Sequence, residues 1–163
     1  MQLYVVRHGA AAPHAAGGDA ARPLTEAGAL EVAAVGRGLR ALGVALDALV
    51  ASPLLRAQQT ARILSDTLGA PEPETEALLD GSAAAPAILR ELATWTRGRG
   101  RLAIVGHQPV LGELVTLASF GAGRASVALP PGGVARIDFA GTPRVASAVL
   151  VWLVTPDLMG RLS

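Results

Sequence analysis

The sequence contains no cysteine, and this absence excludes several kinds of chemistry. Without thiols the chain has no disulfide framework, no thiolate metal site and no cysteine nucleophile. It also has no lysine, since all 14 basic residues are arginine, which with the many alanines and glycines indicates a compositional bias. A single arginine is therefore weak evidence for a binding site in this chain.

The sequence also lacks a strong net charge and a long apolar run. Its formal net charge is +1 with scattered basic residues, whereas nucleic acids and anionic membranes bind concentrated positive patches. The longest apolar stretch, Val145 to Val154, is too short to span a bilayer. A strand is predicted from residue 2, so we expect no signal peptide. We expect a cytoplasmic protein with neither nucleic acid nor membrane as a partner.

The length of 163 residues favours one domain over residues 1–163, and no internal repeat is present. Apolar runs predict buried strands at Leu3–Val6, Asp47–Ala51 and Leu102–Val105, followed by a hairpin of Val134–Phe139 with Val145–Val154. Helices are predicted between them, from Thr25 to Gly43, from Pro53 to Gly69 with Ser52 as cap, from Ala85 to Trp95 and from Pro109 to Ala118. This alternation predicts an α/β three-layer sandwich, mainly parallel at its centre with an antiparallel C-terminal edge hairpin.

Histidine and arginine side chains follow the ends of the three predicted strands. Arg7 and His8 come directly after the first strand, Arg56 shortly after the second, and His107 after the third. The carboxyl ends of parallel strands meet at one edge of a sheet, where ligands bind in α/β folds. Arg56 also falls in the first turn of its helix, where the helix dipole disfavours a cation unless an anion binds there. The pattern therefore predicts a phosphate site.

Three motifs in this order resemble the histidine phosphatase superfamily, whose fold is phosphoglycerate mutase-like. They are Arg7-His8-Gly9, the segment 52–61 (SPLLRAQQTA) and Gly106-His107. The segment Arg22-Pro23-Leu24-Thr25 and the short length are most similar to the SixA-type phosphohistidine phosphatases of that superfamily. The family often carries an acidic residue directly after the first motif, whereas this chain has Ala10.

The resemblance implies a phosphohydrolase that works through a phosphohistidine on the enzyme. His8 is the expected nucleophile, which attacks phosphorus and is then freed by water. Arg7 and Arg56 would disfavour the imidazolium form of His8 and bind the phosphoryl oxygens, and His107 would complete the catalytic pocket. Neither a cofactor nor a metal ion is expected.

Further residues of these regions are candidates for supporting roles. We expect three of them to bind the substrate: Arg22, Gly9 and Ser52. Larger relatives use a carboxylic acid to protonate the leaving group, but no motif identifies one here, and three candidates stay open: Asp80, Glu26 and Asp19.

A weakly placed acid favours phosphohistidine as the substrate, because a phosphoramidate loses imidazole more readily than an ester loses an alkoxide. Between Gly69 and Leu102 there is room for one helix and loops but not for a helical cap, which predicts an open crevice. We therefore expect a partner protein that carries phosphohistidine, such as a phosphotransfer or carrier domain in signal transduction.

Other functions remain open at this point. The same four residues would serve a small-molecule phosphate-ester phosphatase or a mutase, although a mutase needs a closed site. A non-catalytic phosphate-binding module is a second alternative. A metal-dependent hydrolase using His8, His14, His107 and Asp19 is a third, but the spacing is poor and the arginines would repel a divalent cation.

Overall fold

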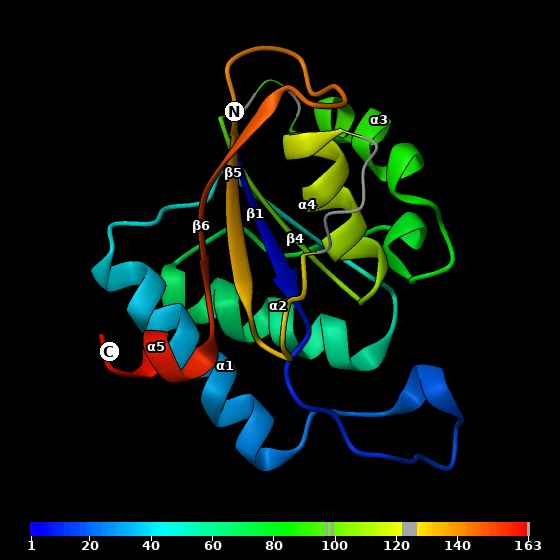
Figure 1. Cartoon of the computed structure of the whole chain (residues 1–163). Coiled ribbons are helices and arrows are strands. Elements are labelled where there is room, and N and C mark those ends of the chain that lie inside the picture. Colours follow the sequence, from blue (N-terminus) through cyan, green and yellow to red (C-terminus); the bar gives the residue numbers. More distant parts are fainter. Residues whose placement is uncertain (97, 99, 122–126, 163) are drawn as a thin grey trace.

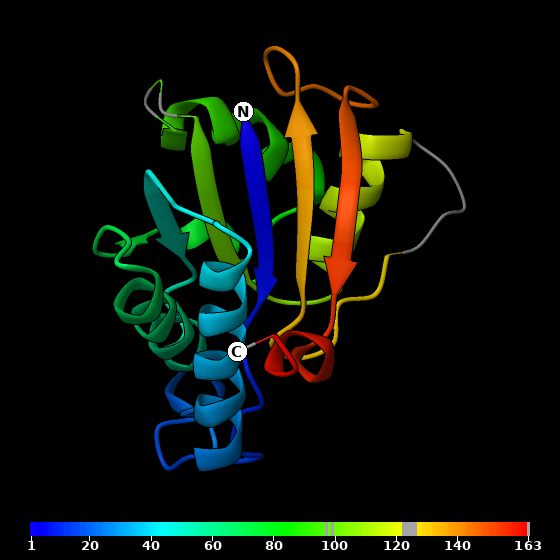
Figure 2. The same cartoon turned by 90° about the vertical axis from the view of Figure 1, so that its left-hand side faces the viewer.

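A six-stranded sheet forms the centre of the computed structural model, which describes residues 1–96, 98, 100–121 and 127–162. The strands lie in the order β3-β2-β4-β1-β5-β6, as Figure 2 shows with the sheet in face view. β3, β2, β4 and β1 are parallel, whereas β5 runs antiparallel to both of its neighbours. The strand bounds are Gln2–Arg7 (β1), Ala48–Ala51 (β2), Glu74–Thr75 (β3), Arg101–Gly106 (β4), Val134–Phe139 (β5) and Ala148–Val154 (β6). The predicted α/β sandwich with a C-terminal antiparallel hairpin is confirmed.

Helices cover both faces of this sheet (Figure 1). On one face lie α1 (Glu26–Ala41), α2 (Leu55–Leu68) and the short α5 (Pro156–Gly160). On the other lie α3 (Ala85–Thr96) and α4 (Val110–Phe120). Two 3-10 helices, η1 (Asp19–Ala21) and η2 (Ala77–Leu79), lie in the connections. Among the described residues, no helix has the length and apolarity needed to cross a membrane.

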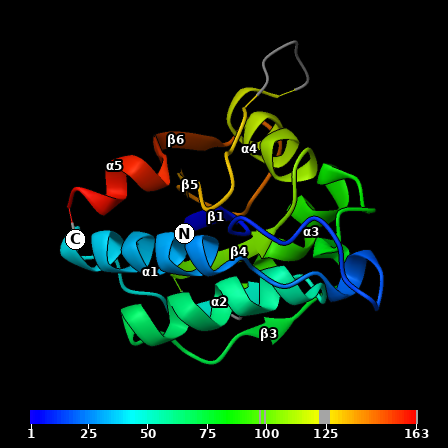
Figure 3. The same ribbon diagram turned by 90° about the horizontal axis from the view of Figure 1, so that it is seen from below.

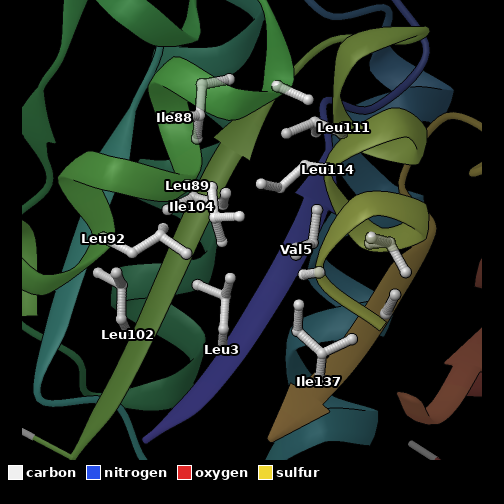
Figure 4. Close-up of a cluster of buried hydrophobic side chains, with 14 of the residues drawn as sticks. Leu3, Val5, Ile88, Leu89, Leu92, Leu102, Ile104, Leu111, Leu114 and Ile137 are labelled. Carbon is white, nitrogen blue, oxygen red and sulfur yellow. The ribbon is translucent and has the colours of Figure 1, made fainter. Parts of the chain in front are cut away.

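Each face of the sheet has its own apolar core, because successive side chains of a strand point to opposite sides. On β1, Leu3 and Val5 pack toward α3 and α4, while Tyr4 and Val6 pack toward α1 and α2. Figure 4 shows the first of these cores, where Leu3 and Val5 meet leucines and isoleucines of the neighbouring elements. Burial on both faces explains why β1 is a continuous apolar run rather than an alternating one.

The structure departs from the predicted elements at three places. The α2 helix begins at Leu55 with Leu54 as its N-cap, so Ser52 does not cap it. Ser52 instead accepts a hydrogen bond from the Leu54 backbone in the preceding turn. The two-residue strand β3 and the one-turn helix α5 were not predicted. Both elements are too short to give a periodic signal.

The parallel strands end at the same edge of the sheet, which Figure 3 shows from below. Strand pairing sets Arg7 of β1 opposite Gly106 of β4, and Ala51 of β2 opposite Val105 of β4. The residues that follow these three strands therefore start from neighbouring positions. This register determines where the candidate site lies.

Candidate active site

The rings of His8 and His107 lie beside each other at the carboxyl edge of the sheet, with centroids 4.9 Å apart and planes tilted by 55°. His8 directly follows β1 and His107 directly follows β4, the strand paired with β1. The backbone amide of His8 donates to the carbonyl of Gly106 at 3.1 Å, which extends the strand pairing into the site. The juxtaposition of the two rings therefore follows from the register of two parallel strands.

His8 is held as a neutral imidazole with a defined tautomer. Its Nδ1 lies 2.7 Å from the carbonyl oxygen of Gly9, and because a carbonyl only accepts, the proton is on Nδ1. Nε2 therefore carries a lone pair, which accepts from Nε of Arg56 at 3.3 Å. The pKa of His8 is lowered to about 4, first by burial and then by the charges of Arg56, Arg7 and Arg22, while the hydrogen bond to Gly9 acts in the opposite direction. At neutral pH Nε2 is free to act as a nucleophile.

Arg56 is the second residue of α2, and its side chain is only 7 % exposed. Besides its contact with His8, it donates from Nη1 to the carbonyl of Asp19 at 2.8 Å and from Nη2 to the Asp19 carboxylate at 3.0 Å. Thr60, one turn later, donates to the carbonyl of Arg56 at 2.7 Å and accepts from the amide of Gly9 at 3.1 Å. Thr60 thus ties the loop after β1 to α2. The spacing of four residues between Arg56 and Thr60 places both on one face of α2, and this spacing could have indicated the role of Thr60 from the sequence.

His107 is oriented by a buried serine. Its Nε2 lies 2.8 Å from Oγ of Ser52, and that oxygen accepts from the amide of Leu54 at 3.2 Å. Nδ1 of His107 is buried and has no hydrogen-bond partner among the described residues. The pKa of His107 is lowered to about 4, first by burial and then by His8 and Arg56, while the carboxylates of Asp19 and Asp80 act in the opposite direction. The ring is therefore neutral at neutral pH, with one nitrogen left for a ligand.

Arg7 lies at the end of β1, and a loop far along the chain fixes its orientation. Its Nη1 donates to the carbonyl of Leu129 at 2.9 Å, across 122 residues of sequence. The same loop binds the backbone around Arg7, since Gly133 accepts from the Arg7 amide and Gly132 donates to the carbonyls of Arg7 and His8. Nε of Arg7 is buried and has no partner in the described part of the chain. No sequence signal pointed to Leu129, because only a backbone carbonyl is used.

The three residues expected to bind substrate differ in their placement. Arg22 forms an ion pair with Asp19 at 3.3 Å, and its own Nε is buried without a partner among the described residues. Ser52 is completely buried, and its hydroxyl contacts His107. The amide of Gly9 donates to Thr60 and its carbonyl accepts from His8. Direct contact with the substrate stays a prediction for these residues, although the polar groups of Ser52 and Gly9 already have hydrogen-bond partners inside the protein.

The three candidate general acids lie in different surroundings. The hydrogen bond from Arg56 lowers the pKa of Asp19, and hydrogen bonds from the side chain and backbone of Ser82 lower the pKa of Asp80. Both carboxylates are therefore ionised at neutral pH. Glu26, the first residue of α1, lines a separate pocket whose other lining residues are Leu24, Thr25, Ala29, Gln59, Arg62 and Ile63. The assignment of a general acid among Asp80, Glu26 and Asp19 stays a prediction.

The arginines near His8 favour an anion as the ligand of this site. Within residues 1–96, 98, 100–121 and 127–162, no group of three histidine, aspartate or glutamate side chains gathers as metal ligands would. His14 is exposed in the loop after β1. Three arginines, in contrast, lie close enough to His8 to lower its pKa. The guanidinium groups of Arg7, Arg22 and Arg56, called the cradle below, are of the kind that binds oxyanions such as phosphate, and Nε of Arg7 and Nε of Arg22 are buried donors without partners among the described residues.

Comparisons with known proteins agree with this geometry. The sequence profile of the histidine phosphatase superfamily (branch 1) matches residues 3–83. The chain is 33% identical over 120 residues to phosphohistidine phosphatase SixA of Escherichia coli (strain K12), covering 71% of this chain and 72% of the relative. It is 39% identical over 123 residues, 74% of each chain, to an uncharacterized protein of Picosynechococcus sp. (strain ATCC 27264 / PCC 7002 / PR-6).

A solved structure extends the likeness over the whole fold. The structure of the protein histidine phosphatase SixA complexed with tungstate superposes with a TM-score of 0.88 at 26% identity, covering 98% of this chain and 99% of that one. The motifs that carry the sequence resemblance are the ones whose side chains converge at the carboxyl edge of the sheet. The chain belongs to the histidine phosphatase superfamily.

Proposed function

We propose that this phosphatase removes phosphate from phosphohistidine on a partner protein, through a phosphohistidine intermediate at Nε2 of His8. One observation carries the proposal: a neutral nucleophilic nitrogen is aligned with a guanidinium, while the carboxylates of Asp19 and Asp80 are held ionised. Such a site can transfer a phosphoryl group, but these two carboxylates bring no proton to a leaving group. It therefore suits a substrate whose leaving group departs without help from an acid.

Phosphohistidine meets this requirement. Nε2 of His8 attacks phosphorus in line, a new P–N bond forms, and the P–N bond of the substrate breaks. The substrate reacts in its ring-protonated form, in which the nitrogen not bound to phosphorus has taken up a proton from solvent, so the departing imidazole leaves as a neutral ring. A phosphate ester would instead release an alkoxide, which needs a proton from a general acid. Water then attacks the phosphorus on His8, inorganic phosphate leaves and the neutral imidazole is restored.

The cationic groups around His8 stabilise the charge on the transferred phosphoryl group. Nε of Arg7 and Nδ1 of His107 are buried polar atoms without partners in the described part of the chain, so donors at these positions are available to the equatorial oxygens. If the Ser52 hydroxyl donates to Nε2 of His107 while accepting from Leu54, the proton of the neutral ring is on Nδ1. The similarity to a SixA structure holding tungstate, a tetrahedral oxyanion, supports this use of the cradle.

The shape of the fold supports a protein substrate. Between α2 and β4 the chain forms only β3, η2 and α3 among its described residues, and α3 packs on the sheet. No helical cap is therefore built from this segment over the carboxyl edge (Figure 3). An uncapped site admits a histidine that projects from a folded phosphotransfer or carrier domain. The name of the relative SixA, a phosphohistidine phosphatase, supports the same substrate class.

The test compares substrates with different leaving groups. We expect a protein phosphorylated on histidine to be hydrolysed with a kcat/KM at least about 100-fold higher than an alkyl phosphate, because only the ester needs an acid. Asp80→Asn should leave the turnover of phosphohistidine unchanged. A preference for esters, or a large loss in Asp80→Asn, would contradict the proposed substrate.

A further inference from the structure

We propose that Asp19 is a positioning residue, which holds the guanidinium of Arg56 so that one particular edge faces His8. The inference deepens the proposed function and rests on it. Asp19 precedes Arg56 by 37 residues and lies at the start of η1, in the loop between β1 and α1. Its carboxylate is 64 % exposed, whereas the side chain of Arg56 is 7 % exposed. An exposed residue thus contacts a buried cation of the site.

The edge of the Arg56 guanidinium that Asp19 occupies decides which N–H donors face His8. The end-on edge carries Nη1 and Nη2, and the side-on edge carries Nε and the other N–H of Nη2. Asp19 covers the end-on edge, because its carbonyl binds Nη1 at 2.8 Å and its carboxylate binds Nη2 at 3.0 Å. Nε, on the side-on edge, points to Nε2 of His8 at 3.3 Å. The two side-on donors are therefore directed to the place where phosphorus is attacked.

Asp19 is itself held in place by a second arginine. Its carbonyl also accepts from the backbone amide of Arg22 at 3.2 Å, and its carboxylate pairs with Nη1 of Arg22 at 3.3 Å. One carboxylate therefore bridges Arg22 and Arg56, two cations that lie on different segments of the chain. A long arginine side chain has several rotatable bonds and loses conformational entropy when a substrate orders it. Because Asp19 already fixes one edge of Arg56, less of this entropy is lost on substrate binding.

If Asp19 positions Arg56, removing Asp19 changes the affinity for an oxyanion in the opposite direction from the one that charge alone predicts. A negative carboxylate near the cradle repels an anion, so removing it would tighten oxyanion binding if charge alone mattered. If Asp19 positions Arg56, its removal weakens binding, because the fork loses its orientation. A general acid, in turn, takes no part in binding a stable oxyanion. Binding of tungstate therefore separates the three roles.

The experiment measures the Kd of tungstate by calorimetry for the wild type, Asp19→Ala and Asp19→Asn. We expect Asp19→Ala to bind tungstate about tenfold more weakly than the wild type. The loss is smaller than that for a fully misplaced group, because the backbone carbonyl of residue 19 still accepts from Nη1 of Arg56. Asp19→Asn should recover most of the affinity, since its amide oxygen still accepts from Nη2. Equal or tighter binding by Asp19→Ala would overturn the proposal.

Two controls make the result specific. Glu72 is a matched control, because it is an exposed carboxylate that pairs with Arg62, another arginine of α2. Glu72→Ala should leave the Kd of tungstate unchanged. In an Arg56→Ala background the Asp19→Ala change should add less than about twofold, because the two residues act as one unit. A full additive loss in that background would show that Asp19 does not act through Arg56.

The readout also separates this inference from the proposed function. Tungstate binding requires the cradle but no turnover, so a wild-type protein that binds tungstate without hydrolysing phosphohistidine would contradict only the proposed function. Circular dichroism and thermal melting of each variant verify folding, and Asp19→Asn provides the comparison with the wild type if Asp19→Ala is unstable. An Asn variant as weak as Asp19→Ala or weaker would contradict positioning through the hydrogen bond to Nη2.

Discussion

Nε of Arg56 lies 3.3 Å from Nε2 of His8, although 48 residues separate them in the sequence. The guanidinium is therefore directed at the lone pair of the proposed nucleophile. This contact serves two purposes, because a positive charge disfavours protonation of the ring and its N–H groups are ready for the oxygens of an incoming phosphoryl group.

His8→Ala should abolish turnover, because no other group offers a lone pair at this position. Rapid quench with a phosphate-labelled substrate should trap an acid-labile phosphoenzyme in the wild type and none in the variant. His14→Ala is the control, since His14 is an exposed histidine in the loop after β1, and it should retain full labelling. Residual labelling of the His8 variant at the wild-type level would end the assignment.

Arg56→Ala should lower kcat by about 10²–10³, the usual effect of losing one donor to the transition state. Arg56→Lys should recover little, because a single ammonium cannot contact Asp19 and a phosphoryl oxygen in the geometry of the fork. Steady-state kinetics measures both, with Arg37→Ala, an exposed arginine of α1, as the control. A lysine variant with near wild-type activity would show that only charge is needed.

The ring of His8 should titrate near pH 4 rather than at its ordinary value of 6.5. The pKa is lowered, so the neutral form dominates above about pH 4 and the nucleophile is lost only as the pH falls through that value. Stability follows the same sign, because unfolded histidine takes up protons below about 6.5 and favours unfolding as the pH falls toward 4. NMR titration of the ring resonances measures the pKa directly. A midpoint near 6.5 would contradict the burial of this ring.

Gly9→Ala should destabilise the protein by about 1–3 kcal/mol, the usual cost of overpacking. A Cβ at this position would lie 2.6 Å from a methyl group of Val32 and 3.1 Å from the carbonyl of Gly28, so the loop after β1 would have to move. Because Gly9 also accepts from His8, activity should fall with stability. Chemical denaturation compares this variant with Gly141→Ala, where no atom lies within 4 Å of the new Cβ. Equal stability of the two variants would contradict the close packing around Gly9.

Ser52→Ala should lower kcat by about tenfold and destabilise the fold by about 1–3 kcal/mol, because Nε2 of His107 and the amide of Leu54 lose their partner in a buried place. Ser119→Ala is the matched control, since its buried hydroxyl has no partner among the described residues. We expect that change to be neutral in both measurements. Wild-type kinetics in Ser52→Ala would mean that His107 needs no orientation by Ser52.

The strands and long helices were predictable because burial imposes a period on their residues. The run Leu3–Val6, buried on both faces, indicated β1, and the spacing of Val32, Val35 and Leu39 indicated α1. Short elements were not predictable. The strand β3 has two residues and is exposed, so it depends on pairing with β2 rather than on its own side chains.

The candidate site was predictable where a side chain with distinctive chemistry follows a strand or lies in the first turn of a helix. Arg7, His8 and His107 satisfied that condition, and Arg56 lay at the start of a helix. Thr60 and the carbonyl of Leu129 escaped notice, because a threonine and a backbone group are common in every part of a chain. For Ser52 and Gly9 the sequence indicated that a polar group lies near the site but not which hydrogen-bond partner this group has inside the protein.

The sequence by itself determined that an imidazole and guanidiniums stand at the ends of buried strands, because apolar runs and helix signals are local and can be recognised without neighbours. Only the tertiary structure decided that Nδ1 of His8 donates to Gly9, that Ser52 supports His107 and that Asp19 holds Arg56. These contacts join separate segments across distances of a few ångströms. They depend on the register of parallel strands and the packing of α2 against the loop after β1, which no local pattern of residues specifies.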